Sequence, residues 1–455
     1  MLHHKGFIIA LLFACTQALD PGQASNFEIS PQVAEEHGCY QNCQGILTKT
    51  SASDLEIFGT QFDFDFYDTA ANFSGSKPGD VLKLKPVDSS TLSVPPGVAV
   101  YKMQYTSVDL DGSLVPSTGF IAFPFAQTPK PFDLVAYAHG TSGVFRGCAP
   151  STSPNLFDYQ SWTPLVVAGY AVVATDYAGL GNNYTAHKYI ASAANANDVY
   201  YSVRAAQTAF PGRLSRQWAS IGHSQGGGAA WKLSEHKLVQ GAKSGYLGGV
   251  AVAPVTKLHD ELEAGLEKLK AVKNIHDYYI LGVIPSSAIA IKAVFPDYKA
   301  PLLSDKMKKR IDLARIGQLC DVATSGLTHD LSLDEMFKNT DTAADSRMEE
   351  FQKLNSPAQG DSASKPLLVI QGAEDTIVFQ NASIAAFDES CKHGNHIRLS
   401  LYPGLDHTAS MTAASPEWLE FIADLFADRH FPRRCSKMTI KPFDLEHAKA
   451  PLDSV

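Results

Sequence analysis

The sequence lacks the features that mark several classes of protein. Its 38 Lys and Arg against 47 Asp and Glu give a formal net charge of −9, which offers no argument for binding nucleic acid or an anionic membrane surface. After residue 14 no apolar run is long enough to span a bilayer as a helix. No two cysteines have the C-x-x-C spacing of a structural zinc site, and internal repeats and low-complexity tracts are absent. We therefore expect no metal, no transmembrane segment and no nucleic-acid partner.

What is present is the composition of an ordinary folded protein. Hydrophobic residues make up 45% of the chain and charged residues 19%, as in globular proteins. A chain of 455 residues can bury a large core without help from a metal. Its length allows one large domain with insertions, or two to three domains.

The N-terminus has the layout of a secretory leader. The basic stretch at 3–5 precedes the apolar run 7–14, and a small-residue site ending at Ala18 follows. This order predicts a signal peptide over residues 1–18, and hence a secreted, extracellular protein. A buried N-terminal helix and a lipoprotein signal ending at Cys15 are the alternatives.

Cysteine usage and glycosylation triplets are compatible with export. Removal of the leader takes Cys15 with it and leaves six of the seven cysteines. An even number in an oxidising compartment predicts three disulfides, although six cysteines allow many pairings. Three N-x-S/T triplets provide candidate glycosylation sites at Asn72, Asn183 and Asn381.

The order of apolar segments predicts an α/β protein. Residues 19–95 are rich in Pro, Gly, Ser and Asp and are expected to form a loop-like covering segment. Residues 98–109 and 114–125 then predict a β-hairpin around Asp111-Gly112. Up to residue 254, short apolar runs alternate with helical stretches, which predicts a mostly parallel sheet with helices on both faces. The expected strands are 133–138, 170–175, 218–222 and 248–253, and the expected helices are 198–210 and 226–238.

This alternation breaks between residues 255 and 351. The segment has helical patterns, clearest over 257–273 and 304–316, and we interpret it as a helical lid or cap inserted into the sheet domain. Strand patterns return over 366–370 and 396–401, and an amphipathic helix follows over 416–428. The core is therefore expected in two parts, 96–254 and 352–440. The polar tail after Cys435, which includes 441–455, is expected to be loosely held.

The clearest chemical motif is Gly222-His223-Ser224-Gln225-Gly226, which matches G-x-S-x-G between a predicted strand and a predicted helix. Such a turn strains the serine backbone, and large neighbours would clash. It lifts the hydroxyl above the sheet edge and directs the following amide toward an oxyanion that develops on the substrate. An incidental serine in a Gly-rich turn is the alternative, and the strand–turn–helix context favours a nucleophile.

A serine nucleophile needs a base, and the base needs an orienting acid. In chains with this motif the partners follow in the order Ser, acid, His. Asp375, after the strand 366–370, is the predicted acid, with Glu374 in reserve and a solvated surface pair as the alternative. His407, in the loop after the last predicted strand, is the predicted general base. Its neighbour Asp406 is badly placed to orient the ring.

A second oxyanion donor is expected after the first short buried strand, where Ala138-His139-Gly140-Thr141 lies. A backbone amide of Gly140 or Thr141 would supply it, while His139 is expected to shape the loop. Asp176 follows another strand, and we favour a structural role for it.

Together these segments resemble the secretory lipases of the α/β-hydrolase superfamily. The matching pieces run in order between Tyr137 and the last helix: AYAHGTSG, GCAPS, TDYAGLG, GHSQGG, GAEDTIV and YPGLDH. The resemblance implies the α/β-hydrolase fold with a helical lid, and a carboxylic ester hydrolase, of which a triacylglycerol lipase is one possibility. It implies Ser224, Asp375 and His407 as catalytic triad, and Gln225 with Gly140 or Thr141 as oxyanion donors.

The resemblance also implies a disulfide pattern and a set of partners. Cys148 would pair with Cys320 and Cys391 with Cys435, which leaves Cys39 and Cys43 as a local pair. The expected partner is a small-molecule or lipid ester, met at a lipid–water interface if it is a lipid, and no cofactor is needed. The alternatives are a serine peptidase or narrow esterase on the same fold, and a non-catalytic binding module, which the presence of all three triad residue types disfavours.

Overall fold

A computed structural model describes residues 22–126, 129–432 and 434–449, so the predicted signal peptide over 1–18 lies outside the described residues. At its centre is a 10-stranded sheet in the order β1-β2-β3-β5-β4-β6-β7-β8-β9-β10. The strands are β1 Val81–Pro86, β2 Ala99–Val108, β3 Leu114–Phe123, β4 Phe132–Ala138, β5 Ala171–Thr175, β6 Leu214–His223, β7 Tyr246–Val252, β8 Leu367–Gly372, β9 Ile397–Tyr402 and β10 Ser436–Thr439.

The sheet is antiparallel at its first edge and parallel beyond it. Strands β1, β2, β3 and β5 pair antiparallel, and every pair from β5 through β4 to β10 is parallel. The sequence of β5, AVVAT, is buried at every position, as expected for a parallel strand covered on both faces. Parallel pairing brings the carboxyl ends of β4, β6, β7, β8 and β9 to one edge of the sheet.

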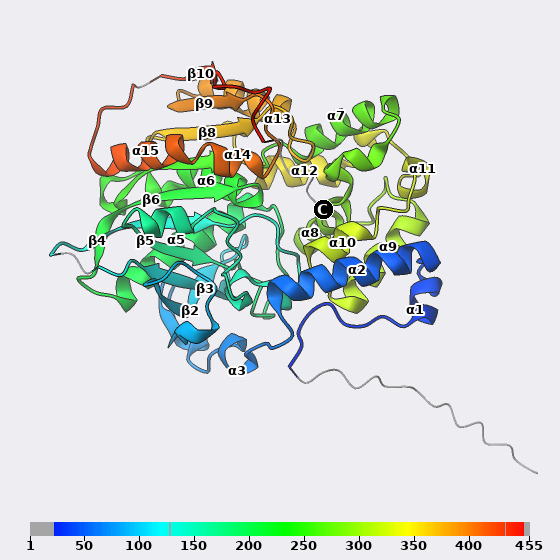
Figure 1. Ribbon diagram of the computed structural model, residues 1–455, viewed down its shortest axis with the longest axis horizontal. Coiled ribbons are helices and arrows are strands. Elements are labelled where there is room, and N and C mark those ends of the chain that lie inside the picture. Colours follow the sequence, from blue (N-terminus) through cyan, green and yellow to red (C-terminus); the bar gives the residue numbers. More distant parts are fainter. Residues whose placement is uncertain (1–21, 127–128, 433, 450–455) are drawn as a thin grey trace, which may run out of the picture.

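Helices cover both faces of this sheet (Figure 1). On one face, α5 (Ser192–Ala209) and α6 (Gln225–Glu235) pack over the central strands, and α13 (Gln380–Lys392) packs beside them. On the other face lie α4 (Thr163–Val167) and α15 (Ser415–Phe426), with α14 (Ala409–Ala413) just before α15. The predicted fold class, an α/β-hydrolase sheet with helices on both faces, is confirmed.

A helical cap lies beside the sheet domain in Figure 1. It forms the insertion between β7 and β8, at the position predicted for the lid, and it has its own apolar core. Ser304 begins α9 by accepting a hydrogen bond from the Met307 amide, which is the expected chemistry of a helix N-cap. The cap helices are α7 Leu258–Ala271, α8 Ile284–Val294, α9 Asp305–Gly317, α10 Asp321–Gly326, α11 Leu333–Met336 and α12 Ser346–Asn355.

The prediction that residues 19–95 are loop-like is wrong. Three helices, α1 (Pro31–Glu36), α2 (Gln41–Phe58) and the short α3 (Phe64–Tyr67), precede strand β1, which joins the sheet edge. Helix α2 has few apolar residues and packs on the cap, where Leu47 shares an apolar cluster with Leu327. Its pattern is weak because tertiary packing, and not propensity, stabilises it.

Helix α2 also provides hydrogen-bond acceptors for the N-terminus of α10, one of the helices of the lid. The buried Asp54 carboxylate accepts hydrogen bonds from the Val322 and Ala323 amides, at 3.1 and 2.9 Å, in the first turn of α10. Unpaired amides at a helix N-terminus favour a carboxylate there, while burial raises the pKa of Asp54 to about 8. The N-terminal segment is therefore attached to the cap.

The expectation of a loosely held tail after Cys435 is also wrong at its start. Strand β10 pairs parallel with β9, although all four of its side chains are exposed. Backbone pairing and the disulfide between Cys435 and Cys391 fix this strand, so no apolar pattern marks it in the sequence.

The structure contains three disulfides, in the pairs that the resemblance implies: Cys39–Cys43, Cys148–Cys320 and Cys391–Cys435. Asn72, Asn183 and Asn381, the asparagines of the three candidate glycosylation triplets, are all exposed. Among the described residues, none of the helices is both long enough and apolar enough to cross a membrane.

Candidate active site

Ser224 sits on a sharp turn between β6 and α6. Its backbone has φ 58° and ψ −118°, outside the regions that non-glycine residues usually occupy. A Cβ on Gly222 would lie 2.0 Å from the carbonyl oxygen of Gly226, and one on Gly226 would lie 1.9 Å from that of Ala138. Both flanking glycines are thus required for the turn to form, and the strain that the motif predicts is present at the serine.

Asp375 and His407 meet after β8 and β9. His407 Nδ1 lies 2.7 Å from Asp375 Oδ2, and both side chains are buried. The Asp375 carboxylate also accepts hydrogen bonds from Gln371 Nε2 and from the amides of Ile377 and Val378, at 2.9 to 3.0 Å. These donors fix the carboxylate beside the ring. Because the carboxylate accepts a hydrogen bond from Nδ1, Nδ1 is the protonated nitrogen and Nε2 is left free to accept a proton.

The reserve acid does not take part. Glu374 is exposed, and within the described residues its side chain has no contact with His407. Asp406 accepts a hydrogen bond from the Ala409 amide at 2.7 Å and so begins α14. Of the three carboxylates near this base, only Asp375 orients its ring.

Ser224 and His407 line the same cavity, together with Gly140, Thr141 and Ile377. We call this the catalytic cavity; its remaining walls come from cap residues, from the loop before α4, and from His223 and Thr408 beside the nucleophile and the base. Among the described residues no hydrogen bond joins the Ser224 hydroxyl to His407. Such bonds are often long without substrate and shorten in the reactive complex.

Two backbone segments offer oxyanion donors. Gln225 is the first residue of α6, so its amide has no partner within the helix and faces the same end as the Ser224 hydroxyl. Gly140 and Thr141 line the catalytic cavity from the loop after β4. A Cβ on Gly140 would lie 3.1 Å from the Tyr159 hydroxyl, which shows how closely this loop approaches the site.

His223, next to the nucleophile, belongs to a directed chain of hydrogen bonds. Its Nε2 lies 3.0 Å from the carbonyl oxygen of His407, which can only accept, so Nε2 carries the proton. Burial lowers the pKa of His223 to about 3, and the ring is neutral. Nδ1 therefore accepts from the Tyr159 hydroxyl at 2.9 Å, and Tyr159 in turn accepts from Tyr137 at 3.1 Å. This chain supports the backbone of His407.

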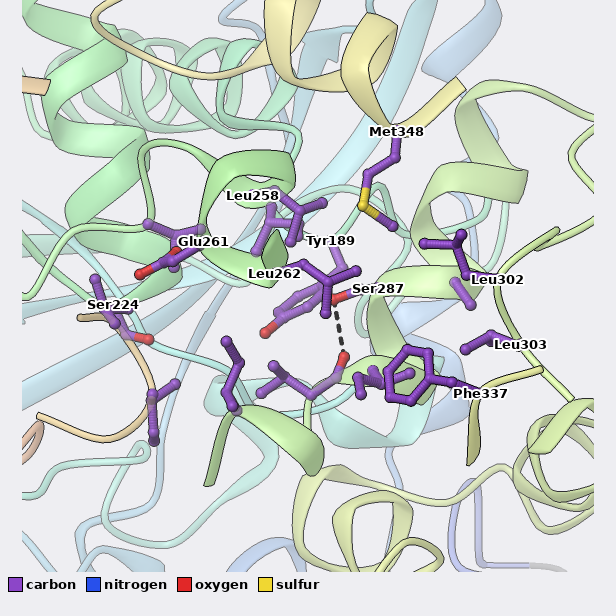
Figure 2. A pocket seen from close by; sticks show the side chains of 18 of the residues that line it. Tyr189, Ser224, Leu258, Glu261, Leu262, Ser287, Leu302, Leu303, Phe337 and Met348 are labelled. Atoms are coloured by element: carbon purple, nitrogen blue, oxygen red, sulfur yellow. Dashed lines mark hydrogen bonds between the residues drawn. The ribbon is translucent and has the colours of Figure 1, made fainter. Parts of the chain in front are cut away.

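A second, apolar cavity opens from Ser224 into the cap (Figure 2). Ser224 and Glu261 lie at one end of the view, and Leu302, Leu303 and Phe337 lie at the other. Apart from a few polar groups, the lining is aliphatic or aromatic and comes largely from the cap, including residues of α7 and α8. We call this the apolar cavity. An elongated apolar group attached to a reacting carbonyl would fit along it.

The remaining candidates have structural roles. His139 contacts the carbonyl oxygens of Gly140 and Asp176, and burial lowers its pKa to about 4, so it shapes the loop as a neutral ring. The Asp176 carboxylate accepts from Thr118, from the Ser151 amide and from the Ser151 hydroxyl, at 2.5 to 2.8 Å. It ties the segment before α4 to the sheet. The described part of the chain brings together no three His, Cys, Asp or Glu side chains that could hold a metal ion.

Sequence reasoning missed several residues that line the site. Tyr159 lies in a loop without a motif, while Tyr279 and Asp321 come from the cap, where no pattern predicts orientation. The only available signal was that Asp321 follows Cys320, the cap partner in a cross-domain disulfide.

Several known proteins are similar to this chain. The model of the prolyl oligopeptidase family matches residues 318–432, which contain Asp375 and His407 but not Ser224. Lipase 10 of Candida albicans is 23% identical over 407 residues, covering 82% of this chain and 82% of the relative. The secreted triacylglycerol lipase LIP7 of Malassezia globosa is 23% identical over 406 residues, covering 82% of this chain and 81% of the relative.

Solved structures with the same fold include two ester hydrolases. Candida antarctica lipase A in its closed state has a TM-score of 0.64 at 18% identity, covering 80% of this chain and 85% of that one. The rice cell wall degrading esterase LipA from Xanthomonas oryzae, in a ligand-bound form, has a TM-score of 0.61 at 16% identity, covering 76% of this chain and 100% of that one.

The chain has the α/β-hydrolase fold. The resemblance of the chain to lipases of the α/β-hydrolase superfamily is confirmed, and these relatives support the expected enzyme class, a carboxylic ester hydrolase.

Proposed function

We propose that this hydrolase is a secreted serine ester hydrolase that acts through Ser224, His407 and Asp375. The observation that carries the proposal is the 2.7 Å contact between His407 Nδ1 and Asp375, at the cavity that Ser224 lines from its strained turn. This arrangement supplies a nucleophile, a base with its acceptor nitrogen free, and an acid that fixes the tautomer.

The reaction proceeds in two steps. The Ser224 hydroxyl attacks the ester carbonyl carbon while His407 Nε2 takes its proton, and Asp375 stabilises the imidazolium that forms. The amides of Gln225 and of Gly140 or Thr141 bind the oxyanion, an effect worth about 3 kcal/mol per donor in comparable enzymes. His407 then protonates the departing alcohol, and water cleaves the acyl-enzyme by the same route in reverse. No cofactor takes part in these steps.

The apolar cavity supports an acyl group of substantial length. It begins at Ser224, and its lining is apolar apart from groups such as Glu261 and Tyr298. Each methylene that leaves water for such a cavity contributes about 0.8 kcal/mol. The acyl chain of the substrate therefore extends into the cap, while the alcohol part lies in the catalytic cavity.

The test is loss of the nucleophile without loss of the fold. Ser224→Ala should abolish hydrolysis of p-nitrophenyl esters and labelling by a fluorophosphonate probe, while its thermal melting temperature stays close to that of the parent protein. Mass mapping should place the probe on Ser224 in the parent. Normal turnover by the variant, or a probe bound elsewhere, would remove Ser224 from the mechanism.

A peptidase remains the second candidate because the prolyl oligopeptidase family model matches residues 318–432. The apolar cavity favours an acyl chain over a peptide, which would present amides that need hydrogen-bond partners. A panel of p-nitrophenyl esters of increasing acyl length, run beside prolyl peptide amides, separates the two. Turnover of the amides without turnover of the esters would favour the peptidase.

Secretion is supported by three observations. The predicted signal peptide precedes the described residues, three disulfides cross-link the chain, and the three candidate glycosylation sites are exposed. The protein should be recovered from the medium of a producing eukaryotic cell, shortened by about the first 18 residues. Retention in the cytosol with an intact N-terminus would contradict export.

A further inference from the structure

Ser224 borders two cavities of opposite character. The apolar cavity extends into the cap, and the catalytic cavity extends past His407 toward α10. An ester bound with its carbonyl carbon at the serine hydroxyl has two arms, and the two cavities can receive one arm each. Because the acyl arm occupies the apolar cavity, the side chains of the catalytic cavity contact the alcohol arm.

The polar atoms of the apolar cavity already have protein partners. The Tyr189 hydroxyl contacts Thr141 at 2.9 Å, and that of Tyr298 donates to Asp345 at 2.7 Å. Ser287 donates to a carbonyl oxygen of its own helix turn, as the dashed line in Figure 2 marks. Glu261 accepts from a backbone amide at 3.0 Å. Little hydrogen-bonding capacity is left there for a substrate.

The catalytic cavity differs at Asp321 and Tyr279. Both side chains line it, and within the described residues neither the Asp321 carboxyl group nor the Tyr279 hydroxyl has a hydrogen-bond partner. The two groups are close enough for the Asp321 charge to raise the pKa of Tyr279 together with burial, which is the larger cause. A substrate hydroxyl group placed between them could donate a hydrogen bond to the Asp321 carboxyl group, and could either donate to or accept from the Tyr279 hydroxyl.

Asp321 is held rigidly in this position. The preceding residue, Cys320, forms the disulfide with Cys148 and a β-bridge with Gly143. Gly143 lies in the loop after β4 that also carries the proposed oxyanion donors, which we call the oxyanion loop. The Asp321 amide donates to the carbonyl oxygen of Ser142 at 3.2 Å. A carboxyl group on a backbone that is fixed in this way is partly preorganised to bind a ligand group, since little backbone freedom remains to be lost.

We propose that Asp321 and Tyr279 form a subsite for the alcohol part of the ester, and that this alcohol bears additional free hydroxyl groups, as glycerol does. The inference rests on the proposed ester hydrolysis at Ser224. A second hydroxyl of the alcohol donates to the Asp321 carboxyl group and lies within reach of the Tyr279 phenol. Burial raises the pKa of Asp321 to about 7, and both its neutral and its ionised forms accept a hydrogen bond from a hydroxyl.

The test compares two esters that share an acyl chain. For the parent, kcat/KM is measured on 1-monodecanoylglycerol and on ethyl decanoate, and the ratio of the two values is the readout. Asp321→Ala should lower this ratio at least about tenfold, because the glycerol hydroxyl loses its acceptor and ethanol has no second hydroxyl to lose. Asp321→Asn, which keeps an acceptor oxygen, should lower it less. Asp334→Ala removes an exposed carboxylate of the same cap and should leave the ratio unchanged.

Three results would overturn the subsite. An unchanged ratio in Asp321→Ala, with normal ethyl decanoate turnover, would show that no hydroxyl contacts the carboxyl group. An equal fall on both esters would mean that Asp321 acts through its electrostatic interaction with His407, and not on the alcohol. A parent that prefers decanoylcholine to the glycerol ester, and loses that preference with Asp321→Ala, would assign the site to a cation. Absence of turnover of either ester by the parent, with amides cleaved, would instead refute the proposed function.

Discussion

Removal of the Cys148–Cys320 disulfide is expected to destabilise the protein more than removal of Cys39–Cys43. The first pair closes a chain segment of sequence separation 172 and the second a segment of separation 4. In the chain-entropy treatment the cost grows with the logarithm of loop length, which gives about 5 kcal/mol for the long loop and about 2 kcal/mol for the short one. The two loops do not overlap in sequence, so their contributions are separable.

The measurement is guanidinium unfolding of two double variants, Cys148→Ala with Cys320→Ala and Cys39→Ala with Cys43→Ala, followed by intrinsic fluorescence. We expect the first variant to unfold at a clearly lower denaturant concentration than the second. It should also lose ester turnover, because the bond fastens the cap beside the oxyanion loop. Equal midpoints for the two variants, or a lower midpoint for the short-loop variant, would refute the loop-entropy reasoning.

Three further outcomes are expected. Tyr159→Phe removes the hydroxyl that donates to His223 Nδ1, so kcat/KM should fall about tenfold at an unchanged melting temperature, and an unaltered kcat/KM would count against a role for this chain of hydrogen bonds. Leu262→Trp fills the apolar cavity and should shift the optimum of a p-nitrophenyl ester series to shorter chains, by about fourfold in kcat/KM per excluded methylene, whereas exposed Leu354→Trp should not. Burial raises the pKa of Glu235 from 4.5 to about 7, so the folded state binds this proton more tightly than the unfolded chain does. The stability that this group contributes therefore falls as the pH rises from 4.5 to about 7, and Glu235→Gln should be more stable relative to the parent at pH 8 than at pH 4. The same difference between the two unfolding midpoints at both pH values would contradict this expectation.

The sheet domain could be predicted from sequence because its signals are local. Strands such as AVVAT are continuous apolar runs, and the G-x-S-x-G turn carries its own glycines. The expected order of nucleophile, acid and base placed Asp375 and His407 in the two loops where the structure has them, within contact of one another. These predictions depend on short segments whose conformation is decided by residues that are adjacent in the sequence.

The predictions from sequence fail where contacts between segments that are distant in the sequence decide the conformation. Helix α2 has an apolar face only in relation to the cap, and strand β10 exists through backbone pairing and a disulfide. The directions of cap side chains such as Asp321 depend on how six helices pack, which no local pattern encodes. The helix predicted over 198–210 begins earlier, at Ser192, because its first turns lie buried beside the site.

The attachment of the N-terminal helix to the cap has a practical consequence. Among the described residues, none that lines either cavity precedes Gly140, so shortening the chain to begin near β2 would look harmless to activity. Yet Asp54 of α2 satisfies the first amides of α10, the helix that begins with Asp321. A truncated protein would leave these amides without their acceptor, in the same helix turn that carries Asp321 of the proposed alcohol subsite. Helix α2 is thus expected to support the proposed alcohol subsite from a distance, and expression designs should retain it.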